Sequence, residues 1–395
     1  MGLRALDHIA CTYEPVWGAQ RRIVAVRLRV RVLEEAADVP RLLLALEDWW
    51  YAGSPILIVA FQHERHLRQA LAATAPDYLW LELPPAAALP SSDWAHPVSL
   101  ARRHGHRLVQ RVPSRVTRRG LPQPSADWRY LLDVGTPATR AAAPIEGDDM
   151  GPQALCAGLT TLASAREWLD HRRGWGVVGW PAADVWAQRS PVQRGPDKAT
   201  LLRVQQALMH DTPLERVVTL IHSDVALTYR LLRLLHSDAV AARRPMPTIR
   251  EAMRALGERR FRDLLLRLMP AAVADPDLLP LRSALVLRAQ CMQWLMDAGP
   301  QQSLATEIYL TGLFSGLTDW WPGSMASLLA PLPLSDAMVE ALVNGQGPYA
   351  PYLHIARRLE DPAALDTLPD ACAEAGFSLQ SVNTALLRTL ARAAA

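Results

Sequence analysis

Three groups of side chains in this sequence could do chemistry, and arginines make up two of them. Arg27, Arg29 and Arg31 alternate along residues 23–32, and seven arginines without one acidic residue lie in the segment 102–119. Guanidinium groups match phosphate oxygens in pairs, so both stretches favour a site for a nucleotide or another anion. The candidates for that site are Arg27, Arg29, Arg107, Arg111 and Arg115. The competing interpretation of segment 102–119 is a solvated arginine-rich loop, which the lack of a glycine-rich cradle favours.

The third group is a pair of histidines, His63 and His66, three positions apart in a helix-like segment. Imidazoles at this spacing can bind a metal, but only Glu64 lies between them and no cysteine is near, which favours ordinary surface histidines. The chain also lacks a nucleophile elbow, a P-loop and a dinucleotide-binding fingerprint after any predicted strand. We therefore expect no metal and no cofactor.

Composition restricts the class of protein. The chain has 395 residues, half of them hydrophobic, which is enough for two domains. A net charge of +3 gives no strong overall field, so a nucleic-acid partner is not expected. Four widely spaced cysteines indicate reduced, buried thiols. Without a signal sequence or a long apolar segment, we expect a cytoplasmic protein that does not contact a membrane.

The first half of the chain is predicted to alternate strands and helices. In residues 23–32, Val26, Leu28 and Val30 share one face and the arginines share the other, which is the period of a strand. Further predicted strands are 56–61, 78–83, 107–112, 130–134, 154–159 and 175–180, with helix-length segments at 38–51, 63–74 and 161–172. Strands and helices in alternation predict a mostly parallel α/β sheet, open or closed into a barrel.

The second half is predicted to be all-α. Apolar residues recur there at helical spacing, and Thr248 with Glu251 has the pattern of a helix-capping box, with Gly257 placed to end the helix. The break falls at 187–198, where two prolines, Gly195 and mixed charges are typical of a linker. The predicted domains are 1–186, a linker at 187–198 and 199–395, and we expect the fragment 195–395 to fold alone.

The second half resembles a known family. Residues 199–269 contain "LLRVQQAL", "TPLERVVTLIHSDVALTYRLLRLLHSDAV" and "PTIREAMRALGERRFRDLLL" in that order, which is similar to the HDOD domain, an all-helical relative of the HD and HD-GYP phosphohydrolases of bacterial signalling. Where the hydrolases carry a His-Asp pair, "TGLFSGLT" has Ser315 and Gly316. Neither residue is a strong metal ligand, so the resemblance implies an inactive scaffold.

The first half resembles the EAL domain, a TIM-like barrel that hydrolyses cyclic di-GMP with two divalent metals. The resemblance covers roughly residues 10–186 and rests on "YEPVWGAQRRIVAVRLRV", "SPILIVAFQHERHL", "YLWLEL" and a closing portion from "ALCAGLTTLASAREWLDHRRGWGVVGWP". It implies a degenerate EAL-like barrel remnant before the HDOD domain, as in EAL-HDOD signalling proteins.

Most of the ligand positions that this resemblance implies have changed. The glutamate of the Glu-Ala-Leu signature falls on Arg27, whose charge repels a metal. Glu82 keeps the third-strand glutamate, and Asp133 matches a later aspartate. Ala157 and Thr160 stand where the family has two glutamates. Two carboxylates do not make a two-metal site, so we predict no phosphodiesterase activity.

Adjacent tryptophans indicate a contact surface. Trp320 and Trp321 cannot both bury their rings on one helix face, so we expect them to contribute to domain packing or a partner interface. The sequence thus predicts a non-catalytic bacterial signalling protein that binds other signalling proteins. The alternative is a receptor that binds cyclic di-GMP or a related nucleotide without hydrolysing it.

Overall fold

A computed structural model of the chain describes residues 2–34, 37–85, 93–113, 125–134, 151–210, 212–237, 248–296 and 302–393. The chain forms two compact units. The barrel unit comprises Met1–Asp184 with Ile355–Ala395, and the helical unit comprises Val185–His354. The predicted layout of an α/β barrel followed by a helical region is therefore confirmed. Within the described parts, no helix has the length and apolarity that crossing a membrane requires.

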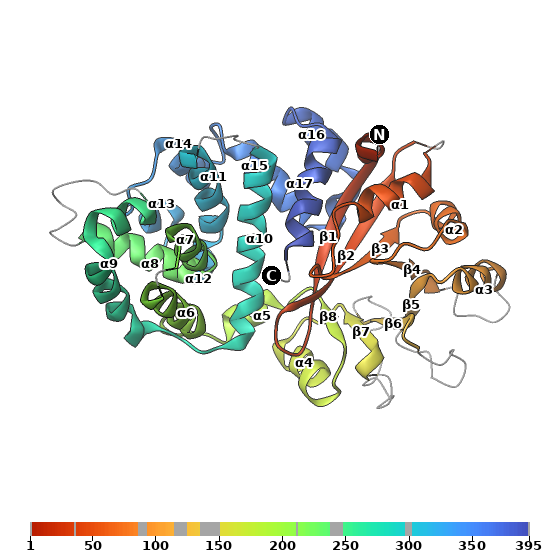
Figure 1. Cartoon of the computed structure of the whole chain (residues 1–395), viewed down its shortest axis with the longest axis horizontal. Helices are drawn as coiled ribbons and strands as arrows, with labels where there is room; N and C mark the ends of the chain where they lie inside the picture. The colour runs from red at the N-terminus through yellow and green to blue at the C-terminus, as the bar shows by residue number, and fades with distance from the viewer. Residues whose placement is uncertain are drawn as a thin grey trace. The chain divides into compact units, whose positions relative to one another are not determined.

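Eight strands close into a barrel in chain order, and β1 runs antiparallel to both of its neighbours while β2 to β8 are parallel (Figure 1). The strands are β1 (Ile9–Trp17), β2 (Ile23–Val32), β3 (Ile56–Phe61), β4 (Leu79–Leu83), β5 (Arg107–Pro113), β6 (Trp128–Asp133), β7 (Ala154–Ala157) and β8 (Gly176–Val178). All seven strands predicted from periodicity are present within a few residues of the expected bounds. Strand β1 was expected only from the family resemblance.

The antiparallel β1 results from a tight turn into β2. The turn spans Gly18 to Arg22 and closes with a hydrogen bond from the Gly18 amide to the Arg22 carbonyl of 2.9 Å. Arg21 adopts a left-handed backbone angle of 57° there, and its guanidinium is fixed by both oxygens of Asp170 at 2.7 and 2.6 Å. Parallel neighbours need a crossover connection, usually a helix, whereas a hairpin does not. The outer face of β1 therefore has no crossover helix of its own.

Helices cover the outside of the other strands. They are α1 (Val39–Glu47), α2 (Glu64–Ala72), α3 (Ala95–Arg103) and α4 (Leu162–Arg166), the last continued by a π-helical turn at Glu167–His171. The C-terminal segment covers β1 and the 3₁₀ helix Gly2–His8 that precedes it. This segment consists of a 3₁₀ turn (Pro362–Asp366), α16 (Leu368–Glu374) and α17 (Leu379–Ala391). The buried amide of Asn383 donates to the carbonyls of Leu6 and Ile9 at 2.8 and 2.9 Å.

This packing corrects the predicted domain boundary. Residues 355–395 were assigned to the helical domain, but they belong to the barrel unit. Helical periodicity says that α17 buries an apolar face, yet it does not say which unit that face covers. Val382, Leu386 and Leu390, at most 1 % exposed, form that face.

We now expect the fragment 195–395 to fold poorly. In that fragment α16 and α17 have lost the strand they cover, which leaves several apolar side chains in water. A fragment of residues 185–359, which ends with α15 (Ala350–Leu359), lacks this uncovered face. Circular dichroism melts and gel filtration compare the two: we expect a cooperative transition and a monomer-sized peak only for 185–359. Equal cooperativity of the two fragments would contradict the assignment of 355–395.

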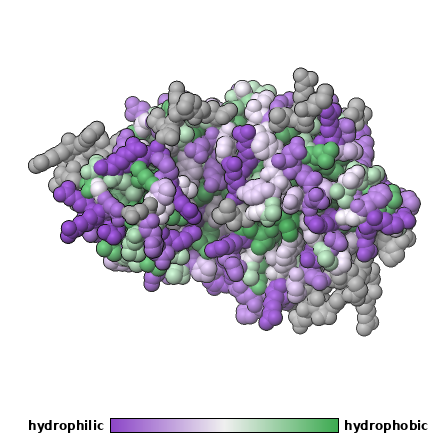
Figure 2. All heavy atoms as spheres, in the orientation of Figure 1, coloured by the Kyte–Doolittle hydropathy of each residue, from purple (hydrophilic) through white to green (hydrophobic). Residues whose placement is uncertain are grey.

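The helical unit is built from helices of 4 to 20 residues. They are α5 (Ala182–Ala187, which begins in the barrel unit), α6 (Lys198–Met209), α7 (Leu214–His222), α8 (Val225–Ser237), α9 (Ile249–Leu268), α10 (Leu279–Met296), α11 (Gln302–Phe314), α12 (Leu317–Trp320), α13 (Met325–Leu329), α14 (Asp336–Val339) with a π-helical turn (Glu340–Asn344), and α15, which ends in the barrel unit. The predicted cap is confirmed, since the Thr248 hydroxyl accepts from the Glu251 amide, and α9 kinks at Gly257. The exposed charged side chains of α9 lie at the left of the molecule (Figure 2).

The predicted linker at 187–198 is a folded part of the helical unit. Ser190 and Gln193 form a reciprocal cap on the 3₁₀ turn Pro191–Gln193, and Arg194 donates to the carbonyls of Trp186 and Arg189. Gly195 packs so closely that a Cβ there would lie 1.8 Å from the Ala271 carbonyl oxygen. Prolines and glycine interrupt regular helices and strands here, and tertiary contacts fix the segment in place.

Candidate functional site

The inside of the barrel contains an apolar layer. It consists of Val16, Ala25, Ile58, Trp80, Val109, Leu131, Leu155, Ala157 and Val178, with Val24, Ile56 and Trp175 packed against it. Side chains two positions apart on a strand face the same way. The residues two positions after Ala25, Trp80, Val109 and Leu131 therefore form a second layer nearer the C-terminal strand ends, and they are Arg27, Glu82, Arg111 and Asp133. This end of an α/β barrel is where binding and catalytic groups lie.

Arg27 and Glu82 form the centre of this layer. The Arg27 Nε and Nη2 atoms donate to the two Glu82 carboxylate oxygens at 2.7 and 2.6 Å, and its Nη1 donates to Glu14 at 3.0 Å. Both side chains of the first pair are buried, 4 % and 7 % exposed. Burial alone would lower the pKa of Arg27, but the charge and hydrogen bonds of Glu82, aided by Glu14 and Asp133, raise it above the ordinary value. Arg27 is thus a permanently charged group inside the barrel.

Two further ion pairs complete the layer. Arg29 donates through Nε to Glu14 at 2.7 Å, and Arg111 pairs with Asp133. Three guanidinium groups, on Arg27, Arg29 and Arg111, are therefore matched by three carboxylates, on Glu14, Glu82 and Asp133. We call these six residues the barrel ion-pair cluster. Since each arginine already has a carboxylate partner, an added anion must compete with that partner.

The other candidates of the anion site are not brought to this cluster. Arg107 begins β5, four residues before Arg111 and toward the opposite end of the barrel, where it lies 3.8 Å from Asp127. Arg115 lies outside the described residues. The predicted arginine surface is therefore divided between the two barrel ends in the part of segment 102–119 that the structure describes.

The implied metal positions of the barrel hold few oxygen ligands. Ala157 is the last residue of β7, and Thr160 is exposed in the loop that follows. Among the described residues, no group of three or more histidine, cysteine, aspartate or glutamate side chains is arranged to hold a metal ion. His66 is buried rather than on the surface, which corrects the expectation for that histidine, and its ring meets His63 edge-on with centroids 6.1 Å apart. The four cysteines are buried and free, as predicted.

Ser315 and Gly316, at the implied metal position of the helical unit, make packing contacts. The buried Ser315 hydroxyl donates to the Gly312 carbonyl at 2.7 Å and accepts from Arg288 at 2.8 Å. A Cβ at Gly316 would lie 2.7 Å from the Leu285 side chain. An aspartate at this position would therefore displace Leu285 before it reached a metal.

The adjacent tryptophans have different environments within the helical unit. Trp320 is completely buried, with its ring edge-on to Trp186 at 4.9 Å and the Arg282 guanidinium 4.7 Å from its centre. Trp320 is therefore a core residue of the helical unit, and its ring is not part of an exposed aromatic surface. Trp321 is half-buried and stacks on Tyr229.

Glu14 is the member of the cluster that the sequence analysis missed. It lies directly opposite Arg27 in the β1–β2 hairpin. Thr12, Glu14 and Val16 alternate with the residues between them, so the period of a strand was present in "TYEPVW". A carboxylate on the same strand face as Val16, within a short alternating segment, was the signal that could have identified Glu14 as a site residue.

The fold and the site define an α/β barrel protein with an internal ion-pair cluster and an additional helical unit. Residues 196–314 match the model of the HDOD domain family, which confirms the HDOD prediction for that part of the chain. The match ends at the last residue of α11, directly before Ser315.

Two proteins illustrate the similarity. The chain is 26% identical over 172 residues to the cyclic di-GMP phosphodiesterase CdgJ of Vibrio cholerae serotype O1 (strain ATCC 39315 / El Tor Inaba N16961), a match that covers 44% of this chain and 40% of that relative's length. Among solved structures, the MmoQ response regulator from Methylococcus capsulatus str. Bath matches 49% of this chain and 98% of its own, with 18% identity and a TM-score of 0.40.

Proposed function

We propose that this chain is a non-catalytic signalling protein in which a degenerate EAL-like barrel and an HDOD domain act by binding other signalling proteins. The observation that carries the proposal is the bidentate contact of Arg27 with Glu82. A divalent metal would need this carboxylate as a ligand, and a guanidinium already neutralises it. The named relative is a cyclic di-GMP phosphodiesterase, which supports an origin in the same signalling chemistry.

The replacement of a metal by arginine removes two catalytic functions together. A metal in a phosphodiesterase polarises the phosphoryl oxygen and lowers the pKa of its bound water, which generates the nucleophile near neutral pH. Arg27 can supply positive charge, but it cannot coordinate and activate a water molecule. Its neighbours Glu82 and Glu14 are held as hydrogen-bond acceptors, so their oxygens are directed at guanidinium nitrogens.

We expect no metal-dependent hydrolysis of cyclic di-GMP. The assay incubates the full chain with cyclic di-GMP and Mg²⁺ or Mn²⁺ and measures the linear product by chromatography. A matched Glu82→Gln variant is the control for contaminating enzymes, since contamination gives the same trace in both samples. Metal-dependent turnover that is present in the natural chain and absent in Glu82→Gln would show that the proposal is wrong.

The second candidate function is a receptor for cyclic di-GMP or a related nucleotide, with Arg29 and Arg111 as its phosphate contacts. Both side chains are one-third exposed, which favours this alternative, although each is paired with a carboxylate. Calorimetric titration with cyclic di-GMP, with and without Mg²⁺, separates the two functions. Binding that weakens in an Arg29→Gln, Arg111→Gln double variant favours the receptor function. If the titration shows no binding heat, the protein-binding function is favoured instead.

A further inference from the structure

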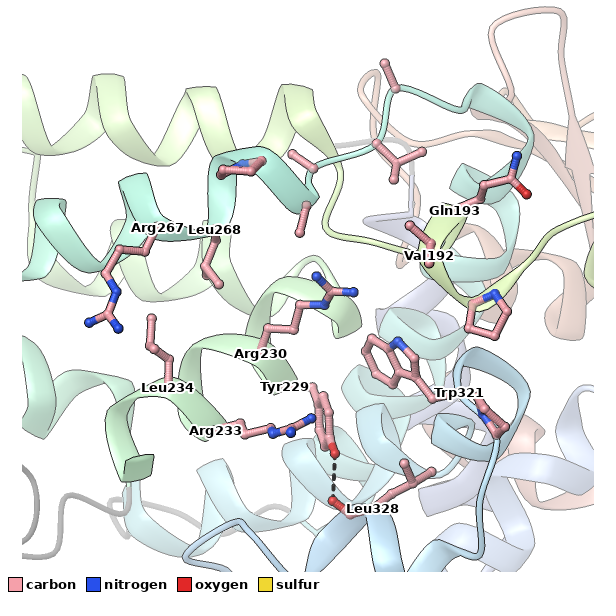
Figure 3. A pocket seen from close by; sticks show the side chains of 17 residues that line it. Val192, Gln193, Tyr229, Arg230, Arg233, Leu234, Arg267, Leu268, Trp321 and Leu328 are labelled. Atoms are coloured by element: carbon pink, nitrogen blue, oxygen red, sulfur yellow. Dashed lines mark hydrogen bonds between the residues drawn. The ribbon is translucent and has the colours of Figure 1, made fainter. Parts of the chain in front are cut away.

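A pocket in the helical unit lies apart from the barrel ion-pair cluster. It has a volume of about 1120 Å³ and is bounded by α8, the last turn of α9, the segment 270–274 after it, and Trp321 with its neighbours (Figure 3). Small-molecule sites in proteins are concave and largely apolar, with a few polar groups that converge on the ligand. This pocket has apolar walls, including Leu268 and Val192, and a set of cationic groups.

The pocket concentrates positive charge. Arg230 and Arg233 come from α8 and are three positions apart, so they share a helix face, and Arg267 comes from the last turn of α9. Arg233 and Arg267 are exposed and Arg230 is half-buried. None of the described residues that line the pocket is acidic. Burial, together with the charge of Arg233, lowers the pKa of Arg230, and the charge of Asp224 acts in the opposite direction.

Two aromatic side chains make a rigid wall beside these arginines. Tyr229 and Trp321 stack with ring centroids 4.6 Å apart and an angle of 29°. The Tyr229 hydroxyl is fixed by a hydrogen bond to the Leu328 carbonyl at 2.9 Å. The Arg230 guanidinium points toward Trp321 and lies 5.9 Å from its ring centre (Figure 3). Cationic groups thus lie next to an aromatic and apolar surface.

From this combination we infer that the pocket binds a phosphorylated small molecule with an aromatic part, a nucleotide by chemical class. Phosphate oxygens match the planar forks of arginine, and one phosphate group can accept from several guanidinium nitrogens. The base provides the flat apolar surface that Trp321 and Leu268 can cover. An acidic peptide supplies only one negative charge per side chain, so it matches three clustered arginines less well. The inference does not rest on the proposed lack of catalysis, because all lining residues belong to the helical unit.

The test is calorimetric titration of the full chain with ATP, GTP, cyclic di-GMP, pyrophosphate and a glutamate-rich peptide. We expect at least one nucleotide to bind, and an Arg230→Gln, Arg233→Gln double variant to weaken that affinity about tenfold or more, as expected for lost charged hydrogen bonds. Arg260→Gln is the matched control, since Arg260 is exposed on α9 but does not line the pocket. Trp321→Leu should weaken nucleotide binding and leave pyrophosphate binding unchanged.

The outcomes separate this site from the barrel. Binding that is lost in the Arg230, Arg233 variant and retained in Arg29→Gln supports the pocket. The inference is overturned when no nucleotide binds, when only the peptide binds, or when the double variant binds as tightly as the natural chain. If circular dichroism shows that the double variant is unfolded, the same titrations are made with the single variant Arg233→Gln, because Arg233 is exposed and its replacement does not disturb the core.

Discussion

Replacing Arg27 by alanine is expected to destabilise the barrel unit by about 3 to 5 kcal/mol, because it leaves the buried Glu82 carboxylate without its bidentate partner. Removing one member of a buried ion pair costs more than the pair contributes, since the remaining charge keeps its desolvation penalty. Urea unfolding of the full chain, followed by circular dichroism, measures the loss. Arg22→Ala is the control, because Arg22 is exposed in the β1–β2 turn.

The double variant Arg27→Met, Glu82→Leu distinguishes a buried ion pair from a general packing defect. Apolar residues of similar size remove both charges at once, so most of the lost stability should return. A double variant that is less stable than Arg27→Ala alone would contradict this account. The same variant is a useful reagent for the function, since it removes the guanidinium without creating an uncompensated carboxylate.

Replacing Asp224 by alanine is expected to destabilise the helical unit by a similar amount, about 3 to 5 kcal/mol. The Asp224 carboxylate accepts from the backbone amides of Ala226 at 2.8 Å, Leu227 at 3.2 Å and Asp197 at 2.5 Å, and it pairs with Arg282. Asp224 and Arg282 are both buried. The substitution removes the cap of α8 and leaves a buried guanidinium unpaired.

Thermal unfolding of Asp224→Ala and of its control measures this effect. Asp263→Ala is the matched control, because Asp263 is exposed on α9 and its loss should change stability by less than about 0.5 kcal/mol. Asp224→Asn keeps the size of the side chain and part of its acceptor capacity. The stability of this variant should therefore lie between that of Asp224→Ala and that of Asp263→Ala. An Asp224→Ala variant as stable as the control would mean that Arg282 finds another acceptor beyond the Gly195 carbonyl, to which it already donates at 2.7 Å.

The elements of this protein could be predicted from sequence because their signals are local. The alternation in residues 23–32 predicted β2, and the Thr248 cap predicted the start of α9, whereas Gly257, which was expected to end the helix, only kinks it. The HDOD domain was likewise visible in the order of its helices, and the family match confirmed it for residues 196–314. Such signals depend on neighbours within a few positions, where the period of a helix or strand repeats.

The site could be predicted only in part. Glu82 and Asp133 were identified through a resemblance, and their pairing with Arg27 and Arg111 depends on the registers of four different strands. The period of β2 gave two faces, one of valine and leucine and one of arginine, but it did not say that the arginine face lies inside the barrel. In a closed barrel both faces of a strand are covered, so polarity alone does not separate inside from outside.

The sequence by itself determined seven of the eight strands, several of the helices, that the second half is helical, and that the cysteines are buried thiols. The tertiary structure alone decided that α17 covers β1, that Trp320 is core and Trp321 is not, and that Arg230 and Arg267 share a pocket although 37 positions separate them in the chain. The physical reason is that secondary structure follows from local backbone and side-chain preferences. Contacts between distant segments follow from packing of the complete apolar surface, and no short stretch of sequence contains that information.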